Sequence, residues 1–375
     1  MASALPVLIV GAGPAGLATA AELTRRRIPF RLFERGTSLG ASWVNAYASL
    51  RLHTGKHMSA LPGLRYPKGT PLFPSRDEFV SYLNAYAEHF QLGVELDSAV
   101  EALTREDDRW VARVNGNRIE GRAVVMACGI MCNPARPTFE GEETFPGTIS
   151  HSVRYRNPDP YRGTRVLVVG VGNSGGEIAS ELGAAGADVT ILVRRGANVV
   201  PRTLAGVPIQ YLAVGLRRLP RSIRTRVASL VQRVSARRHG PAVLPRPPWT
   251  PLDAIPLIGF HLVEAIRAGV VRLQLGTIRH FDQSTVVFSD GTRDSFDHVI
   301  LATGFRPALE PLGNLIRRDE RGFPMRTDNV TSADQPDLWY VGMRYDSTGA
   351  IANINADARM VARRLASRSI RDRLG

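Results

Sequence analysis

The pattern of apolar residues in this chain occurs twice. Residues 7–16 (VLIVGAGPAG) and 166–175 (VLVVGVGNSG) each join a short aliphatic run to the motif Gly-x-Gly-x-x-Gly. An aliphatic run that ends in a turn signal is typical of a strand buried on both faces. Apolar residues at helical spacing follow each motif, at Leu17, Ala21 and Leu23 in the first copy and at Ile178, Ala179 and Leu182 in the second. Each copy therefore predicts a strand, a tight turn and a helix with one apolar face.

A second short strand completes the pattern in each copy, at residues 30–34 and 188–194. Two such openings predict an α/β protein with two Rossmann-like dinucleotide-binding domains. The other elements that the pattern predicts are helices at 76–90 and 353–366 and strands at 110–114, 123–127, 286–288 and 299–303. Residues 199–256 are rich in proline and arginine, and we interpret them as an excursion from the second domain.

The glycines of each motif have separate tasks in binding a dinucleotide. Gly11 would make the turn, Gly13 would let the backbone approach a pyrophosphate, and Gly16 would let the helix pack closely on the strand. The phosphates would then lie at the N-terminus of the helix, where backbone N–H groups point outward. The second copy has its glycines at the same three places, Gly170, Gly172 and Gly175.

The two copies differ where the adenosine ribose of a dinucleotide would lie. Glu34 ends the second strand of the first copy, and a carboxylate there can accept hydrogen bonds from ribose hydroxyls. The second copy has Arg194 and Arg195 at this place, and paired guanidinium groups attract a 2′-phosphate. We therefore predict FAD at the first site and NADPH at the second, with electrons passing from nicotinamide to flavin. A contribution to general positive charge is the alternative role of the two arginines.

The order of the motifs predicts a discontinuous FAD-binding domain. Residues 1–155 and 296–375 would form this domain, and residues 156–295 would form an NADPH-binding domain inserted into it. With 375 residues, 44% of them hydrophobic, the chain is long and apolar enough for two cores.

Composition and charge exclude several classes of protein. The net charge is +14, but no motif combines basic and aromatic residues for reading bases, so we expect no nucleic acid partner. The two cysteines, Cys128 and Cys132, are too few for a disulfide framework and one residue too far apart for a redox Cys-x-x-Cys pair. The low cysteine count fits a reducing compartment, and we expect a cytoplasmic protein. No stretch is long enough to span a membrane.

One segment identifies a family. Residues 145–155 (FPGTISHSVRY), directly before the second glycine motif, match the pattern Phe-x-Gly-x-x-x-His-Ser-x-x-Tyr. This segment resembles the signature of flavin-containing monooxygenases, which have the two-domain flavoprotein fold of the disulfide reductases. The resemblance extends through residues 40–43, 172–175 with Glu177, 301–305 and 357–358. Leu52, His53, Lys56 and residues 296–307 are most similar to the plant auxin-forming branch.

The resemblance implies a reaction in two halves. NADPH reduces FAD, and O2 then adds to the flavin to give a C4a-(hydro)peroxide that transfers one oxygen atom to a small organic substrate. The protein would exclude water and hold the substrate, so few acid or base side chains are expected. At matching positions the resemblance implies FAD contacts for Pro14, Ala15, Arg35, Trp43, His53, Thr303 and Asp357, and NADPH contacts for Asn173 and Ser174.

Two residues are implied as catalytic, His53 and Asn173. Many family members have an asparagine beside the flavin where this chain has His53, and a histidine there either donates a proton or packs on the ring. Tyr155 stands where Baeyer–Villiger members carry tryptophan, which disfavours ester formation from ketones. We interpret His151 as a structural residue of the linker.

Several alternatives stay open at this level. The oxygenation is either oxidation of nitrogen or sulfur or oxidative decarboxylation of an aryl 2-oxo acid, which the plant branch favours. The other classes are an NAD(P)H-dependent reductase that passes electrons to another acceptor without oxygenation, and a cofactor-bound scaffold. The basic stretch 217–238 predicts an amphipathic helix that packs on the NADPH domain, lies on a membrane surface or covers a substrate channel. The sequence leaves the substrate and a homodimer open.

Overall fold

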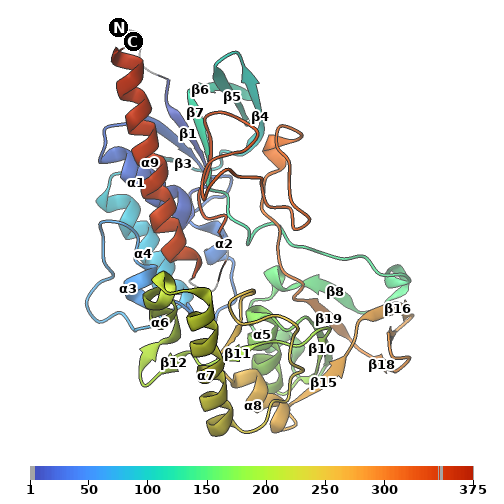
Figure 1. Ribbon diagram of the computed structural model, residues 1–375. Coiled ribbons are helices and arrows are strands. Elements are labelled where there is room, and N and C mark those ends of the chain that lie inside the picture. The colour runs from blue at the N-terminus through green and yellow to red at the C-terminus, as the bar shows by residue number, and fades with distance from the viewer. Residues whose placement is uncertain (1–4, 345, 347–348, 375) are drawn as a thin grey trace. The chain divides into compact units, whose positions relative to one another are not determined.

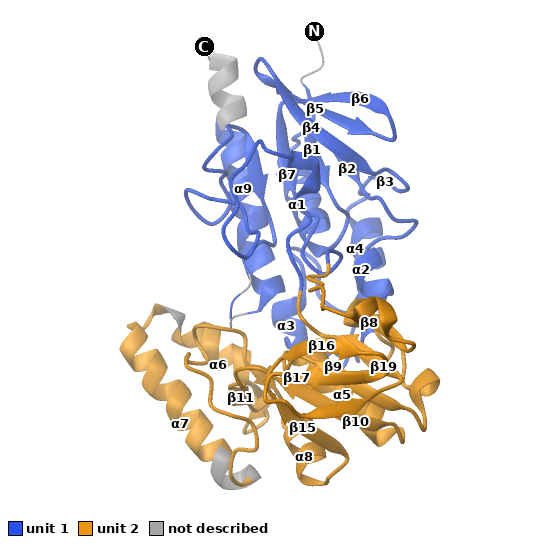
Figure 2. Cartoon of the chain, turned by 90° about the vertical axis from the view of Figure 1, so that its right-hand side faces the viewer, with its two compact units in different colours: residues 1–45, 50–133, 305–375 blue, residues 46–49, 134–304 orange. Residues whose placement is uncertain are grey.

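The computed structural model describes residues 5–344, 346 and 349–374, and the chain forms two compact units. Unit 1 comprises residues 1–45, 50–133 and 305–375, and unit 2 comprises residues 46–49 and 134–304 (Figure 2). The predicted boundaries, after residue 155 and before residue 296, therefore lie within unit 2. The bounds differ because β8 (Thr148–His151) and β19 (His298–Leu301) pair with each other in the sheet of unit 2.

A five-stranded parallel sheet lies at the centre of unit 1, in the order β20-β7-β1-β2-β3. These strands are β1 (Val7–Val10), β2 (Phe30–Phe33), β3 (Val94–Glu95), β7 (Ala123–Met126) and β20 (Leu338–Tyr340). Val10 pairs with Phe33 on one side and with Met126 on the other. The carboxyl ends of three strands therefore meet where the first glycine motif begins.

Strand β1 is apolar throughout because both faces of this sheet are buried. Val7 and Ile9 belong to a core formed with α1 (Pro14–Thr24), α4 (Arg76–His89) and α9 (Ala350–Leu374). Leu8 and Val10 belong to a second core, shared with the antiparallel sheet of β4 (Val100–Glu106), β5 (Arg109–Val114) and β6 (Asn117–Gly121).

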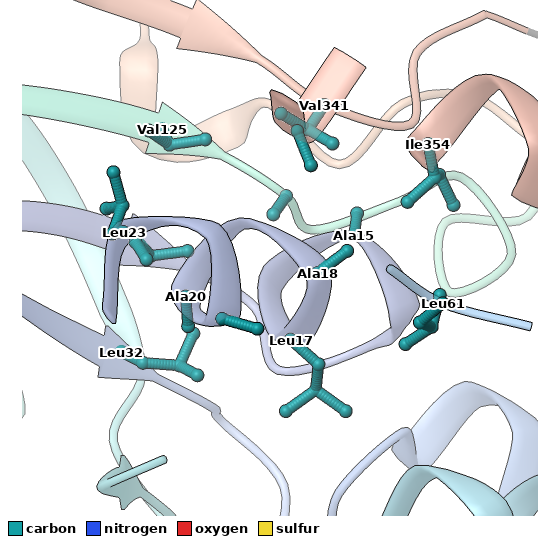
Figure 3. Packing of buried hydrophobic residues seen from close by; sticks show 14 of the residues in the cluster. Ala15, Leu17, Ala18, Ala20, Leu23, Leu32, Leu61, Val125, Val341 and Ile354 are labelled. Carbon is teal, nitrogen blue, oxygen red and sulfur yellow. The ribbon is translucent and has the colours of Figure 1, made fainter. Parts of the chain in front are cut away.

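Helix α9 packs beside α1, although the two are far apart in the sequence (Figure 1). Small residues of α1 allow this approach, and Figure 3 shows Ala15 and Ala18 facing Val341 and Ile354. The C-terminal part of unit 1 thus reaches the beginning of α1, where the glycine motif lies.

Unit 2 repeats the architecture around β9. Its parallel sheet has the order β15-β10-β9-β19-β8, with β9 (Arg165–Val169), β10 (Asp188–Val193) and β15 (Val271–Leu275). Helices α5 (Asn173–Ala184) and α8 (His261–Arg267) and a small antiparallel sheet of β16 (Ile278–Asp282), β17 (Thr285–Phe288) and β18 (Arg293–Ser295) complete the core. In both units the strand before the glycine motif is central, so the predicted α/β fold with two Rossmann-like sheets is confirmed.

The predicted excursion 199–256 begins at β11 (Val199–Val200) and ends just before β14 (Leu257–Ile258), and these two strands pair in parallel. It contains β12 (Thr203–Leu204), β13 (Val207–Pro208), α6 (Ile209–Gly215) and α7 (Arg221–His239). The short helices elsewhere are α2 (Ala41–Val44), α3 (Lys56–Ser59) and the 3-10 turns η1 (Glu142–Thr144), η2 (Ser152–Arg154), η3 (Asp159–Tyr161) and η5 (Glu310–Leu312), with η4 (Leu216–Arg218) inside the excursion. Within the described residues, no helix is long and apolar enough to cross a bilayer.

Candidate dinucleotide sites

The first glycine motif is held in place by contacts within unit 1. Gly11 has a φ of +100°, and a Cβ on it would lie 2.9 Å from the carbonyl oxygen of Ala127. A Cβ on Gly16 would lie 1.8 Å from the carbonyl oxygen of Gly11, where no side chain fits. The turn and the close packing of α1 on β1 therefore require glycine at both positions.

Gly13 is a glycine for a different reason. Its φ of −79° and ψ of −171° suit any residue, and no protein atom lies within 4 Å of a Cβ built there. Gly13 is also the N-cap of α1. Because glycine has no side chain, it supplies no side-chain acceptor for the N–H groups in the first turn of α1. We call the open space at this middle glycine, beside the N–H groups of the first helical turn, a cradle. Such an arrangement binds a pyrophosphate, so this part of unit 1 fits a dinucleotide.

The second motif has the same geometry in unit 2. Gly170 has a φ of +109° and its Cβ would lie 2.6 Å from the carbonyl oxygen of Ala302, while a Cβ on Gly175 would lie 2.0 Å from that of Gly170. Gly172 has a φ of −72°, and again no protein atom lies within 4 Å of a Cβ there. In each motif, therefore, the first and third glycines are closely packed, and only the middle glycine has open space where a Cβ would lie.

Glu34 connects the end of β2 to the first motif. Its carboxylate accepts hydrogen bonds from the backbone N–H of Ala12 at 2.8 Å and of Gly36 at 3.0 Å, and the residue is buried. Arg35, next in the sequence, is exposed. The Glu34 carboxylate thus fixes the turn that precedes the cradle, and it lies at the strand end where the ribose of a bound dinucleotide is expected.

Trp43 and His53 lie on the segments that follow β2 in unit 1. The Gly40 N–H donates to the carbonyl of Ala12 at 3.2 Å, which ties the start of α2 to the glycine motif. The Trp43 ring, on α2, packs edge-on against Phe79 of α4 with centroids 4.6 Å apart. His53 is half-buried in the bend that leads to α3.

Asp357 is buried in α9, where its carboxylate forms an ion pair with Arg344 at 2.9 Å. Burial raises the pKa of this carboxyl to about 6, although Arg344 favours the charged form. Gly342, with a φ of +81°, brings the chain against α1, since a Cβ on it would lie 3.3 Å from that of Ala15. Gly342 and Arg344 were not among the predicted site residues, and a glycine at the end of the apolar stretch 338–341 was the available local signal for Gly342.

Asn173, the first residue of α5, is fixed by its side chain. The amide group donates to the carbonyl of Pro256 at 3.1 Å and accepts from the N–H of Ile258 at 2.8 Å. The end of the excursion is thereby tied to the second glycine motif. Ser174 follows in the first turn of α5 and is half-buried.

Arg194 and Arg195 are exposed directly after β10, and the Gly170 N–H donates to the carbonyl of Leu192 in that strand. The pair therefore lies at the same sheet edge as the second motif. A Cβ on Gly196 would lie 1.8 Å from the carbonyl oxygen of Pro245, so the excursion returns to this turn and brings Arg246 with it. Arg246 is exposed, and no local pattern relates it to Arg194 and Arg195.

Thr303 is the one predicted FAD contact that the structure places in unit 2. Its hydroxyl donates to the carbonyl of Ala135 at 2.6 Å, and its neighbour Ala302 touches the second glycine motif. The other ten predicted FAD contacts, Gly11, Gly13, Pro14, Ala15, Gly16, Glu34, Arg35, Trp43, His53 and Asp357, lie in unit 1.

An acidic cluster on α5 was not predicted as part of a site. Glu177 accepts a hydrogen bond from the hydroxyl of Tyr47 and lies 3.5 Å from Arg202, and Glu181 accepts one from Tyr155 at 2.9 Å. Burial, together with the negative charge of Glu177, raises the pKa of Tyr47. The cluster fixes the first turns of α5, directly after Asn173 and Ser174.

His151 and the two cysteines form hydrogen bonds with backbone groups. His151 Nδ1 accepts from the N–H of Val153 at 3.2 Å, so Nε2 carries the proton and faces the carbonyl of Gly304 at 3.0 Å. Burial lowers the pKa of His151. The Cys128 thiol donates to the carbonyl of Ala308 at 2.7 Å, and burial raises the pKa of both Cys128 and Cys132. In the described part of the chain no three His, Cys, Asp or Glu residues are grouped to hold a metal ion.

Comparison with known proteins identifies the family. Residues 8–240 match the model of the family described as pyridine nucleotide-disulphide oxidoreductase. The chain is 33% identical over 327 residues to indole-3-pyruvate monooxygenase YUCCA1 of Oryza sativa subsp. japonica, covering 83% of this chain and 80% of that protein. It is 31% identical over 373 residues to indole-3-pyruvate monooxygenase YUCCA6 of Arabidopsis thaliana, covering 95% and 88%.

Solved structures share the fold. A flavin-containing monooxygenase from Stenotrophomonas maltophilia superposes with a TM-score of 0.78 at 23% identity, covering 98% of this chain and 99% of that one. A bacillithiol disulfide reductase from Staphylococcus aureus superposes with a TM-score of 0.71 at 18% identity, covering 98% and 99%. Both likenesses concern the fold alone.

The family model and the relatives imply FAD and NAD(P)H as cofactors, with an organic substrate and O2. Gly13 and Gly172 each leave open space in their motif. From the matched family model and from relatives that are more than 30% identical over most of its length, the chain belongs to the flavin-containing monooxygenases, a family of flavoprotein oxidoreductases.

Proposed function

We propose that this enzyme uses NADPH and O2 to insert one oxygen atom into a small organic molecule, with FAD held in unit 1 and NADPH in unit 2. The proposal rests on the pair of open cradles at Gly13 and Gly172. After the second strand of each motif, unit 1 has the carboxylate of Glu34 and unit 2 has Arg194 and Arg195. When bound, FAD accepts hydride from nicotinamide and activates O2, which side chains alone cannot do.

The residues of each unit have defined tasks in this proposal. The N-termini of α1 and α5 bind the two pyrophosphates, and Glu34 receives the ribose hydroxyls of FAD. Arg194 and Arg195 bind the 2′-phosphate of NADPH, assisted by Arg246. His53 holds or donates a proton beside the flavin ring, and Asn173 acts through its two backbone hydrogen bonds as a positioning residue for the nicotinamide dinucleotide.

We propose an aryl 2-oxo acid as the substrate class, because both plant relatives described above are named indole-3-pyruvate monooxygenases. The balance is that a 2-oxo acid, O2, NADPH and a proton give the shortened carboxylic acid, CO2, NADP⁺ and water. One oxygen atom enters the new carboxyl group and the other leaves as water. Oxidation of nitrogen or sulfur in an amine or thioether is the second version.

The first experiment is anaerobic reduction of the purified enzyme by NADPH, followed by rapid mixing with oxygenated buffer. We expect a transient absorbance band near ~370 nm before the spectrum of oxidised flavin returns. Direct return of the oxidised spectrum, combined with fast turnover of an artificial electron acceptor, would mean a reductase. Absence of bleaching by NADPH would leave only a cofactor-bound scaffold. The half-buried thiols of Cys128 and Cys132 are hydrogen-bonded and have raised pKa values, which argues against a dithiol reductase.

The second experiment identifies the substrate class. Indole-3-pyruvate, phenylpyruvate, a tertiary amine and a thioether are supplied in turn, and product is compared with NADPH consumed. One mole of CO2 and of shortened acid per mole of NADPH supports the 2-oxo acid. Product from the amine or thioether alone supports the second version.

The third experiment tests the choice of NADPH over NADH. Arg194→Glu combined with Arg195→Glu should raise the KM for NADPH by about a hundredfold, from the loss of two charge-assisted contacts of about 1.5 kcal/mol each. The KM for NADH should change little. Arg279→Glu, at an exposed arginine elsewhere in unit 2, is the matched control. Equal effects of the double substitution on both coenzymes would contradict the 2′-phosphate assignment.

A further inference from the structure

The excursion of unit 2 contains a run of chain with one sign of charge. From residue 199 to residue 252 the sequence has ten arginines and no aspartate, glutamate or lysine. The described residues with large exposed apolar side chains are also concentrated here. Four of the eleven lie between residues 219 and 234, namely Leu219, Ile223, Leu230 and Val234.

Helix α7 brings these two features to one face. At 100° per residue, Ile223, Leu230 and Val234 lie within about 40° of one another on the helix, with Arg226 and Arg233 on one side of them. We call these five residues the outer face of α7. Ile223 is 40% exposed, Leu230 54% and Val234 37%, and both arginines are exposed.

The opposite side of α7 already has its packing partners. Val231 and Ser235 are buried, and α7 packs on β11 of unit 2. Arg221, at the start of the helix, pairs with Asp253. Figure 2 shows α7 at the edge of unit 2. The outer face of α7 is thus more exposed than the side that holds Val231 and Ser235.

The charges of the outer face are not neutralised by the protein. Among the described residues, Arg226 and Arg233 form no ion pair. A second copy of this chain would bring arginines against arginines, which is unfavourable. A nucleic acid would neutralise the arginines but leave the apolar side chains without a partner. An anionic lipid surface satisfies both, because its headgroups bind guanidinium groups while its acyl region receives leucine and isoleucine.

We propose that the outer face of α7 is a docking surface for anionic membranes, on which the helix lies parallel to the bilayer. The inference is independent of the proposed substrate and coenzyme. It gives the enzyme access to a membrane surface.

The test is sedimentation of the purified full-length enzyme with lipid vesicles. Vesicles of phosphatidylcholine alone are compared with vesicles that also contain phosphatidylglycerol, at low and at high salt. We expect binding only to the anionic vesicles and loss of binding at high salt, because screening weakens contacts between arginines and headgroups.

Two double variants separate the charged from the apolar contribution. Arg226→Gln with Arg233→Gln, and Ile223→Ser with Leu230→Ser, should each weaken vesicle binding by about tenfold or more. The matched controls are Arg279→Gln with Arg293→Gln and Leu275→Ser, at exposed positions of unit 2 outside the excursion, and these should bind like the parent. Circular dichroism melting shows whether each variant keeps its fold.

A gain of signal complements these losses. In Leu230→Trp the added indole should shift its emission to shorter wavelength on anionic vesicles, whereas Leu275→Trp should not. Equal binding to neutral and anionic vesicles, binding that survives both α7 variants, or no vesicle binding at all would overturn the proposal. So would an oligonucleotide that binds the enzyme in an arginine-dependent way while the Ile223 and Leu230 substitutions have no effect, because the face would then be a polyanion site.

Discussion

At the scale of single residues, the middle glycine of each motif separates binding from folding. Gly13→Ala adds a methyl group that no protein atom opposes, at a backbone conformation that alanine adopts freely. We expect unchanged stability of the flavin-free protein and FAD binding weakened by about tenfold or more, since the methyl group fills the space of the pyrophosphate. Flavin retention after gel filtration and titration with FAD measure this.

Two other glycines of unit 1 are the controls for Gly13. Gly93→Ala also meets open space, but outside the motif, and should leave both stability and FAD binding unchanged. Gly16→Ala should impair folding itself, because its Cβ would lie 1.8 Å from the Gly11 carbonyl oxygen. If Gly13→Ala retained FAD like Gly93→Ala, the cradle would not be the pyrophosphate site.

Asp357 makes a pH-dependent contribution to stability. Its pKa of about 6 lies above the ordinary value of 3.8 because the carboxyl is buried. The folded protein therefore binds this proton more tightly than the unfolded chain does, and the resulting stabilisation is complete below about pH 4 and lost as the pH rises through about 6.

We expect the unfolding free energy of the parent, relative to that of Asp357→Asn, to fall by up to about 3 kcal/mol between about pH 4 and about pH 7. Denaturant titrations of the flavin-free proteins at both values measure it. Asp108→Asn, an exposed substitution in the same unit, should show no such trend. If the unfolding free energy of the parent instead rose relative to that of Asp357→Asn as the pH increases, the pKa of Asp357 would not be raised by folding.

At the scale of elements, α4 shows how a helix of the core begins. The Ser75 hydroxyl accepts from the N–H of Glu78 at 3.2 Å, and the Glu78 carboxylate accepts from the N–H of Ser75 at 2.7 Å, which together form a capping box. Phe79, Tyr82, Leu83 and Tyr86 then face the core.

Ser75→Ala should lower the unfolding free energy by about 1 kcal/mol, because one N–H of the first turn loses its acceptor. Ser81→Ala, at an exposed position within the same helix, should be neutral or slightly stabilising. Denaturant midpoints of the two variants give the comparison, and equal midpoints would show that the cap contributes nothing.

At the scale of the whole molecule, removal of the flavin should act on unit 1. A ligand present at a hundred times its Kd stabilises the folded protein by about 2.7 kcal/mol. We expect the flavin-free enzyme to melt at lower temperature and FAD to restore the midpoint, while NADP⁺ protects amide hydrogens around α5 in unit 2. Hydrogen exchange measured by mass spectrometry shows which amide hydrogens each cofactor protects. If FAD protected unit 2 and not unit 1, the cofactor assignment would be contradicted.

Features that depend on neighbouring residues could be predicted from the sequence. The two glycine motifs with their strands and helices, the difference between Glu34 and the pair Arg194 and Arg195, and the family signature at 145–155 all lie in short segments. Local sterics and periodicity determine such segments, so both Rossmann-like sheets were predicted correctly.

Which distant segments meet became clear from the three-dimensional fold. It placed Thr303 with the second motif, brought Arg246 to the turn at Gly196 and brought Gly342 against Ala15. It also placed β8 in the sheet of unit 2 and left one face of α7 exposed. Most of these outcomes depend on strand pairing and packing between residues far apart in the chain, for which a single sequence carries no local signal. The exposed face of α7 depends on which side of this amphipathic helix packs on the core.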